Sequence, residues 1–344
     1  MNEKTFSLRR LYNISIFVLV VGLFAYLCFS EHGLLDLIKR SKELDKEWLI
    51  VAVLAHFLNL FIDMFLIYIL TNKASNEGRY RFKEAFKSSL VGQFFSAVTP
   101  SSTGGQPMQV YVMSKQNIDG GIAVSVLIQK FLVYQTVLTT YSATAILIRF
   151  DYFNNKLDKA MWIFTMIGFI VQAIVILGIL LFSLNKSFVE QSIACILKVL
   201  EKFRILKNSE SKSQKANERL IDFYKGNHEL FKDKPLMIKT YLLTGIQLLS
   251  MFSVPYFVCR SFRSEKANFM KIICAQSFIV SSSSLVPTPG SLGAAEGATG
   301  VFLSPFFTED TIKSAVLITR LISYYLTLII SFPFSRVAKQ KNKT

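Results

Sequence analysis

The sequence has little charge for its length. Charged residues make up 18% of the 344 residues, whereas 51% are hydrophobic and Phe alone occurs 31 times. An ordinary globular domain carries about 25% charge. This balance excludes a disordered chain and argues against a soluble one.

Residues that build metal sites, disulfides or common catalytic centres are also scarce. The four cysteines form no C-x-x-C pair, and the three histidines have no H-x-x-x-H spacing. P-loop, G-x-S-x-G and G-x-G-x-x-G motifs are absent, as is a nucleophile beside a base. We therefore expect no metal, no cofactor and no catalytic residue. The cysteines (Cys28, Cys195, Cys259, Cys274) are expected to be small buried side chains.

Apolar runs long enough to cross about 30 Å of hydrocarbon recur along the chain. The first follows Lys4, Arg9 and Arg10, and no A-x-A-like cleavage site comes after it, so we interpret it as an uncleaved helix. Six full spans are predicted, at about Leu11–Phe29, Trp48–Leu70, Gly120–Ile148, Met161–Leu184, Leu236–Val258 and Ser314–Phe334. The fold class expected is an all-α polytopic membrane protein in a single domain, 1–344.

Two further apolar stretches are too short to cross and are interrupted by Pro and Gly. Ala85–Val98 runs into Thr99–Pro107, and Ile272–Val286 runs into Pro287–Gly293 and a second short run to Phe307. Exposed backbone cannot face lipid, so such breaks lie inside protein or against water. We predict two re-entrant hairpins; ordinary loops between short helices are the alternative.

The net charge of +16 comes from 39 Lys and Arg against 23 Asp and Glu. With the N-terminus inside, 24 of the basic residues fall in inside segments and 12 in outside segments. Basic loops favour the cytoplasmic side, so both termini are predicted to be cytoplasmic. The hairpins then enter from opposite sides, which is typical of an inverted repeat with halves at about 1–150 and 160–344.

The longest loop, 185–235, holds 11 basic and 7 acidic residues. Between Val189 and Arg204 its apolar residues recur at helical spacing. Such a helix would lie on the anionic inner membrane surface. A packed cytoplasmic connector remains an equal alternative.

Four ionisable residues fall at membrane depth: Asp63, Lys130, Glu296 and Arg320. Each costs at least about 2.5 kcal/mol at the bilayer centre unless it is paired. Glu296 is surrounded by small residues, and Arg320 lies early in the last span. We expect these two to form an ion pair, either as a static lock or in contact with a polar headgroup.

The first hairpin carries neutral hydrogen-bonding groups instead of charges. Its hydroxyls and amides surround Gly104 and Gly105, whose backbone amides are expected to be free for phosphate or another anion. The sequence has no arrangement of paired carboxylates that would act as acid and base. This favours a site that binds a ligand and lets it pass over a site that breaks a bond.

At these two hairpins the sequence resembles the transmembrane region of lysylphosphatidylglycerol synthases, also described as flippase-like membrane proteins. The resemblance rests on Phe94–Pro100 and Gly104–Tyr111, and on Val286–Gly290, Gly293, Ala295–Gly297, Arg320 and Tyr324-Tyr325. Many members have acidic and basic residues where this chain has Gln106, Gln109 and Gln129-Lys130, a Gln-rich pattern found in low-GC Gram-positive relatives. The resemblance implies a multi-pass protein of the bacterial cell membrane and a lipid substrate.

Taken together, the motifs predict a lipid-headgroup site. Its candidate residues are Thr99, Ser101, Ser102, Gly104, Gly105, Gln106, Gln109, Lys130, Pro287, Thr288, Gly290, Gly293, Glu296, Arg320 and Tyr324. The two tips are expected to meet, with 101–106 facing 288–296 across a polar cavity.

Three functions remain open at this stage. The leading one is movement or handling of an anionic or aminoacylated phospholipid, such as phosphatidylglycerol or lysylphosphatidylglycerol, between leaflets. The second is a phosphatidylglycerol lysyltransferase, or its membrane subunit. Lysyl-tRNA would then be a further partner, and the lipid modification would give resistance to cationic peptides. The third is a scaffold without transport. Apart from lysyl-tRNA, the expected partners are a phospholipid substrate and the anionic membrane surface.

Overall fold

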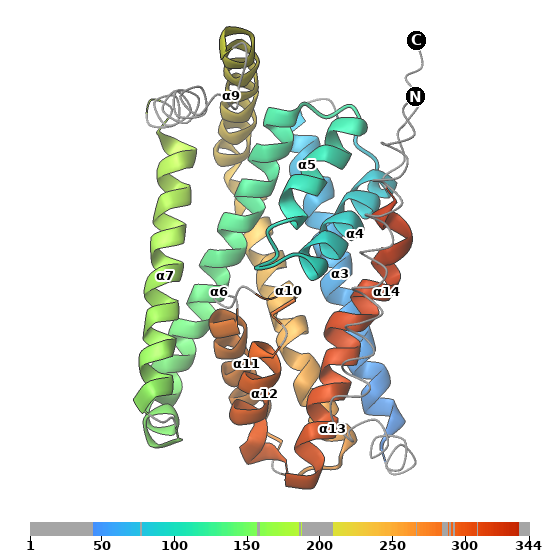
Figure 1. Ribbon diagram of the computed structural model, residues 1–344, viewed down its shortest axis with the longest axis vertical. Coiled ribbons are helices and arrows are strands. Elements are labelled where there is room, and N and C mark those ends of the chain that lie inside the picture. Colours follow the sequence, from blue (N-terminus) through green and yellow to red (C-terminus); the bar gives the residue numbers. More distant parts are fainter. Residues whose placement is uncertain are drawn as a thin grey trace. The chain divides into compact units, whose positions relative to one another are not determined.

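The computed structural model describes residues 44–75, 78–156, 159–185, 187, 209–265, 267–283, 288, 290–291, 293–307 and 309–336 (Figure 1). The predicted first span at Leu11–Phe29, the predicted helix at Val189–Arg204 and Pro287 lie outside these residues.

Helices account for the regular structure of the described residues. They are α3 (Lys46–Ser75), α4 (Phe82–Val98), α5 (Gly105–Lys115), α6 (Gly120–Lys156), α7 (Lys159–Leu184), α9 (Ser209–Lys232), α10 (Lys234–Ser261), α11 (Phe269–Ser283), α12 (Ala294–Leu303), α13 (Glu309–Arg320) and α14 (Leu326–Ser331). A π-helical segment, η2 (Leu321–Tyr325), joins α13 to α14, so these three elements form one continuous rod in Figure 1.

Within the described residues, four helical segments are long and apolar enough to cross a membrane: Lys46–Ser75, Gly120–Ala145, Lys234–Ser261 and Thr311–Ser335. Each coincides with a span predicted from the sequence. The predicted run at Met161–Leu184 falls in α7, where a shorter apolar stretch, Ile170–Ser183, is described. Large apolar side chains point outward from α3, α7 and α10, among them Leu54, Phe61, Ile174 and Leu242. Such exposed apolar faces suit hydrocarbon rather than water.

The chain divides into two compact units, each built from segments distant in sequence. Unit 1 contains the described residues up to His56, with Gln93–Gly105 and Met251–Ser335. Unit 2 contains Phe57–Gly92, the described residues of Gln106–Ser250, and Arg336.

In unit 2, helix α9 is docked on α6 through small residues. A Cβ at Gly121 would overlap backbone of α9, and one at Gly226 would overlap the Ser125 hydroxyl of α6. Asn227 and Tyr224 of α9 also donate hydrogen bonds to the carbonyls of Ser183 and Phe182, at the carboxyl end of α7. The described part of the 185–235 loop is therefore a packed connector.

In unit 1, the amino-terminal part of α3 packs with the carboxyl-terminal part of α10 and with α13. Their core includes Ala52, Val258 and Ile318. Helices α11 and α12 pack against each other, with the rings of Phe278 and Phe302 stacked at 6.3 Å.

Candidate functional site

Helices α4 and α5 form an antiparallel helical hairpin. Within unit 2, Gly92 of α4 lies against the side chain of Gln109, and the Ser88 hydroxyl donates to Oε1 of Gln116, 2.9 Å away. Gln116 also donates to the carbonyl of Glu84, one turn further back along α4. These contacts move backward along α4 as they move forward along α5, so the two helices are antiparallel, and Gln109 is buried between them. Both a re-entrant hairpin and an ordinary loop between short helices have this packing.

The turn between these helices is closed by its own side chains. Thr99 donates its hydroxyl to the carbonyl of Phe95 at 2.6 Å and accepts the amide of Gly104 at 2.9 Å. The amide of Gly105 donates to the carbonyl of Ser102. The expectation of free amides at Gly104 and Gly105 is therefore wrong, because a turn this tight uses them internally.

What the first tip exposes instead is hydroxyl groups on a strained backbone. Ser101 and Ser102 have φ of 49° and 56°, and both side chains are exposed. Left-handed residues other than Gly cost roughly 1–2 kcal/mol each and gather at functional positions.

The second tip repeats this backbone feature. Gly290 and Ser291 have φ of 59° and 54°, so each tip contains two successive left-handed residues. The amide of Gly293 donates to Oε2 of Glu296 at 2.5 Å and caps α12. The amide of Gly293 is thus not free for a ligand either, because the Glu296 carboxylate accepts it at the start of the helix.

Glu296 and Arg320 form the ion pair predicted from the sequence. Arg320 Nε donates to Oε1 of Glu296 at 2.8 Å, and the two side chains keep 13% and 21% of their surface exposed. Arg320 Nη2 also lies 3.4 Å and 3.5 Å from the carbonyls of Gly290 and Ser291. Glu296 therefore bridges the start of α12 to the last span, and Arg320 holds the second tip.

Tyr324 joins the two tips within unit 1. Its hydroxyl donates to the carbonyl of Ala97, near the end of α4, at 2.9 Å. A Cβ at Gly290 would overlap the same ring, and the Arg320 guanidinium lies 5.6 Å from the ring centroid. Tyr324 lies in the π-helical segment, a departure from α-helix often found at functional sites. Both broken segments thus contact one aromatic side chain.

Three further candidate residues belong to unit 2, whereas the Tyr324 cluster belongs to unit 1. They are Gln109, Lys130 and the exposed Gln106, which begins the unit 2 part of α5. Thr288 accepts the amide of Ser291 on its carbonyl and so belongs to the second turn.

The sequence did not predict a second buried ion pair, in unit 2. Lys130 Nζ lies 2.5 Å from Oδ1 of Asp63, whose Oδ2 accepts the Ser89 hydroxyl at 2.5 Å. Opposite charges in two predicted spans were the available signal. In unit 1, a hydrogen bond between His56 Nε2 and Thr327 Oγ1, 2.7 Å apart, connects α3 to α14. No pattern in the sequence indicated this contact.

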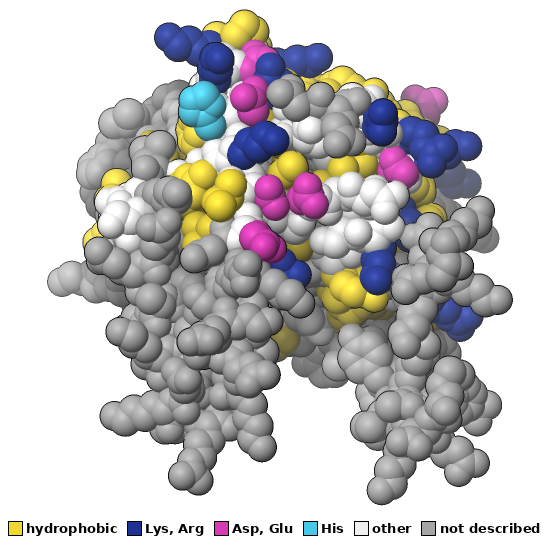
Figure 2. Space-filling model, turned by 90° about the horizontal axis from the view of Figure 1, so that it is seen from above, with side chains coloured by type: hydrophobic (Ala, Val, Ile, Leu, Met, Phe, Trp, Pro, Cys, Tyr) yellow, Lys and Arg dark blue, Asp and Glu magenta, His cyan; other side chains and the backbone are white. Residues whose placement is uncertain are grey.

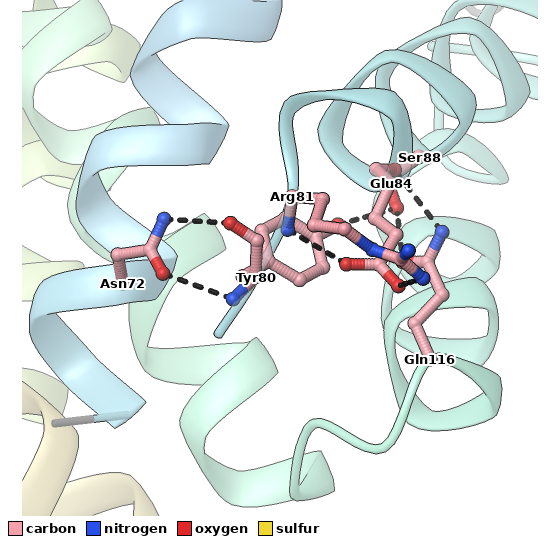
Figure 3. Close-up of polar contacts among 6 residues, drawn as sticks. All are labelled: Asn72, Tyr80, Arg81, Glu84, Ser88 and Gln116. Atoms are coloured by element: carbon pink, nitrogen blue, oxygen red, sulfur yellow. Dashed lines mark hydrogen bonds and ion pairs between the residues drawn. The ribbon is translucent and has the colours of Figure 1, made fainter. Parts of the chain in front are cut away.

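A cluster of six polar residues fixes the α3–α4 connection in unit 2 (Figure 3). Asn72 donates to the carbonyl of Tyr80 and accepts its amide. The Tyr80 hydroxyl donates to Gln116 and contacts Ser88, which orients the hairpin relative to the loop. Burial raises the pKa of Tyr80, so this phenol stays a hydrogen-bond donor.

The end of unit 2 that carries α9 is rich in charge. Figure 2 shows Lys and Arg side chains around this face, with Asp and Glu between them. Lys73 Nζ lies 2.9 Å from Oδ2 of Asp233, and the hydrogen bond from Lys73 holds the pKa of Asp233 below its usual range. Burial, and then the neighbouring Asp119, raise the pKa of Asp222.

Apolar outer faces, four candidate spans and ion pairs inside the helix packing define an integral membrane protein with several spans. The chain belongs to the lysylphosphatidylglycerol synthase transmembrane-region family, whose model matches residues 12–331. It is also similar to the UPF0104 membrane protein of Archaeoglobus fulgidus, with 26% identity over 287 residues. The matched region covers 82% of this chain and 84% of that protein.

Proposed function

We propose that this protein moves an anionic or aminoacylated phospholipid between the leaflets of the bacterial cell membrane. The observation that carries the proposal is the meeting of both broken segments at Tyr324, beside the Glu296–Arg320 pair. A charged pair at membrane depth is a functional-site hypothesis by default. The family description supports a lipid-related role.

The headgroup would be recognised by hydroxyl groups and one guanidinium. Ser101 and Ser102 are exposed at the first tip, and Arg320 supports the second. These groups suit a phosphate, which accepts hydrogen bonds from both neutral and charged donors. Because the amides of Gly104, Gly105 and Gly293 are already bonded, we assign this role to the side chains.

The arrangement in the membrane is part of the proposal. We propose six full spans, two re-entrant hairpins entering from opposite sides, and both termini in the cytoplasm. Two hairpins with the same pair of left-handed residues at their tips support an inverted repeat with a central site. The lipid tails would stay in hydrocarbon while the headgroup passes the tips.

A leaflet-resolved lipid assay tests the proposal. Purified protein in phosphatidylglycerol vesicles with a labelled phosphatidylglycerol should move label between leaflets faster than empty vesicles do. Ser101→Gly with Ser102→Gly should slow this movement, because it removes both hydroxyls while easing the left-handed backbone. Asn117→Gly is the matched control, since Asn117 is also left-handed, at φ of 64°, and belongs to unit 2.

Two results would redirect the assignment. Loss of lysyl-lipid from cells lacking the gene, with no movement in vesicles, would favour a part in making that lipid. Equal movement in full and empty vesicles, with unchanged cell lipids, would favour a scaffold.

A further inference from the structure

The buried carboxylate of Asp63 is held by donors from three other helices of unit 2. Lys130 Nζ of α6 contacts Oδ1, the Ser89 hydroxyl of α4 donates to Oδ2, and Gln247 Nε2 of α10 lies 3.5 Å from Oδ1. The side chains of Asp63 and Lys130 keep only 6% and 16% of their surface exposed. Side chains of α4, α6 and α10 therefore converge on one acidic group of α3.

The pair lies deep within two candidate spans. Asp63 is twelve residues from the end of α3 at Ser75, and Lys130 is ten residues from the start of α6 at Gly120. At about 1.5 Å per residue these separations are about 18 Å and 15 Å, close to half of a bilayer's hydrocarbon thickness. A pair at this depth is expected near the middle of the hydrocarbon layer.

A neighbouring polar atom is left without a partner. Gln129, next to Lys130, is fully buried; its Nε2 lies 3.1 Å from the sulfur of Met237, and its Oε1 has no hydrogen-bond partner. A buried acceptor left unsatisfied costs about 1–3 kcal/mol, so it calls for a functional explanation.

We propose that Asp63 and Lys130 form a proton-binding site whose protonation is coupled to the movement of lipid. A proton that adds to Oδ1 of Asp63 makes a neutral acid, breaks the ion pair and leaves the charge on the Lys130 ammonium. The unit then carries one more positive charge, and α3 and α6 lose their strongest link. The coupling rests on the proposed lipid movement, whereas the proton site does not.

The groups that face Asp63 set how it responds to pH. From α6 these are Lys130 and Tyr134, which interacts electrostatically with the carboxylate. From α4 and α10 they are the neutral Ser89 and Gln247; the nearby Lys239 of α10 is directed at the ring of Phe65. Lys130 is thus the one cation in ion-pair contact with Asp63 among the described residues, and its attraction is what protonation removes.

The proton site is tested without lipid movement. Infrared difference spectra of the reconstituted protein, recorded as pH is lowered, should show the carbonyl band of a protonated carboxylic acid that is absent from the double variant Asp63→Asn with Lys130→Met, in which neither charge is left uncompensated. A band that persists in this double variant, or that never forms while the unmodified protein is folded, overturns the site.

The coupling is tested with a pH gradient across the vesicles at zero membrane potential. The rate of label movement should change with the gradient, by up to about tenfold per pH unit, because site occupancy follows proton activity. The double variant Asp63→Asn with Lys130→Met should lose this response. It is expected to fold, because removing both charges leaves neither uncompensated.

A matched control is the double variant Lys73→Met with Asp233→Asn. This pair also links α3 to the α9–α10 junction of unit 2 but is partly exposed, so the gradient response should remain. Movement that ignores the gradient in the unmodified protein overturns the coupling and leaves the proposed function standing. No movement under any condition overturns the proposed function, and the infrared result still decides the proton site.

Discussion

Glu296 does two things at once: one carboxylate oxygen caps α12 and the other binds Arg320. A side chain with both oxygens engaged cannot be exchanged for a neutral one without loss at one end. Arg320 is equally committed, to Glu296 and to the carbonyls of the second tip. At the residue scale the site is therefore held by shared partners.

The first prediction concerns this pair. Glu296→Gln and Arg320→Met should each lower the free energy of unfolding by about 3–5 kcal/mol, because each leaves the other charge buried without a partner. The double change should cost less than the sum of the two. Thermal unfolding in detergent measures all three, and simple additivity would show that the charges are not coupled.

The second prediction concerns Gly290. Gly290→Ala should abolish lipid movement, because the new Cβ overlaps Tyr324 and the φ of 59° strains any side chain. The ring must shift and release the carbonyl of Ala97. Gly297→Ala and Gly300→Ala are the controls: both lie in α12 with open space around them, and Ala favours a helix. Normal movement in Gly290→Ala would remove Tyr324 from the mechanism.

Helices α9 and α6 are joined as closely as their backbones allow. Gly121 and Gly226 let the two helices approach, and Leu220, Phe223 and Leu230 of α9 are buried. At the element scale this docking positions the junction to α10, which carries Gln247 toward Asp63.

The third prediction tests this docking with two adjacent glycines. Gly121→Ala should release α9, because the Cβ overlaps the carbonyl of Arg219, which a side-chain rotation cannot relieve. Gly120→Ala meets only ordinary contacts at 3.8 Å and should be tolerated. Protease cleavage within 209–232 should accelerate in the first variant alone; equal rates in both would mean that α9 docks by its other contacts.

Among the described residues, both units contain a buried ion pair between helices: Glu296–Arg320 in unit 1 and Asp63–Lys130 in unit 2. At the scale of the whole molecule, charged side chains also occur along α9 and at the ends of helices, as on the face in Figure 2. Basic residues at such ends govern orientation in a membrane.

The fourth prediction is this orientation. Cysteines placed near Arg263 should react with an impermeant reagent in intact cells, whereas cysteines near Lys212 should react only after permeabilisation. The reason is the excess of Lys and Arg in the segments predicted to be inside. Labelling near Lys212 in intact cells would reverse the topology and exchange the entry sides of the two hairpins.

The sequence by itself determined the helical membrane class, four spans that the structure contains, the two broken segments and the Glu296–Arg320 pair. A helix must be long and apolar to cross the hydrocarbon layer, and a charge inside that layer is costly unless it is paired. Composition and residue spacing therefore suffice to predict these features. Only the tertiary structure decided that Lys130 pairs with Asp63 and that Tyr324 joins the tips. It also decided that the amides of Gly104 and Gly293 are used internally. These contacts depend on backbone dihedrals and on packing between distant segments, which no local pattern of residues encodes.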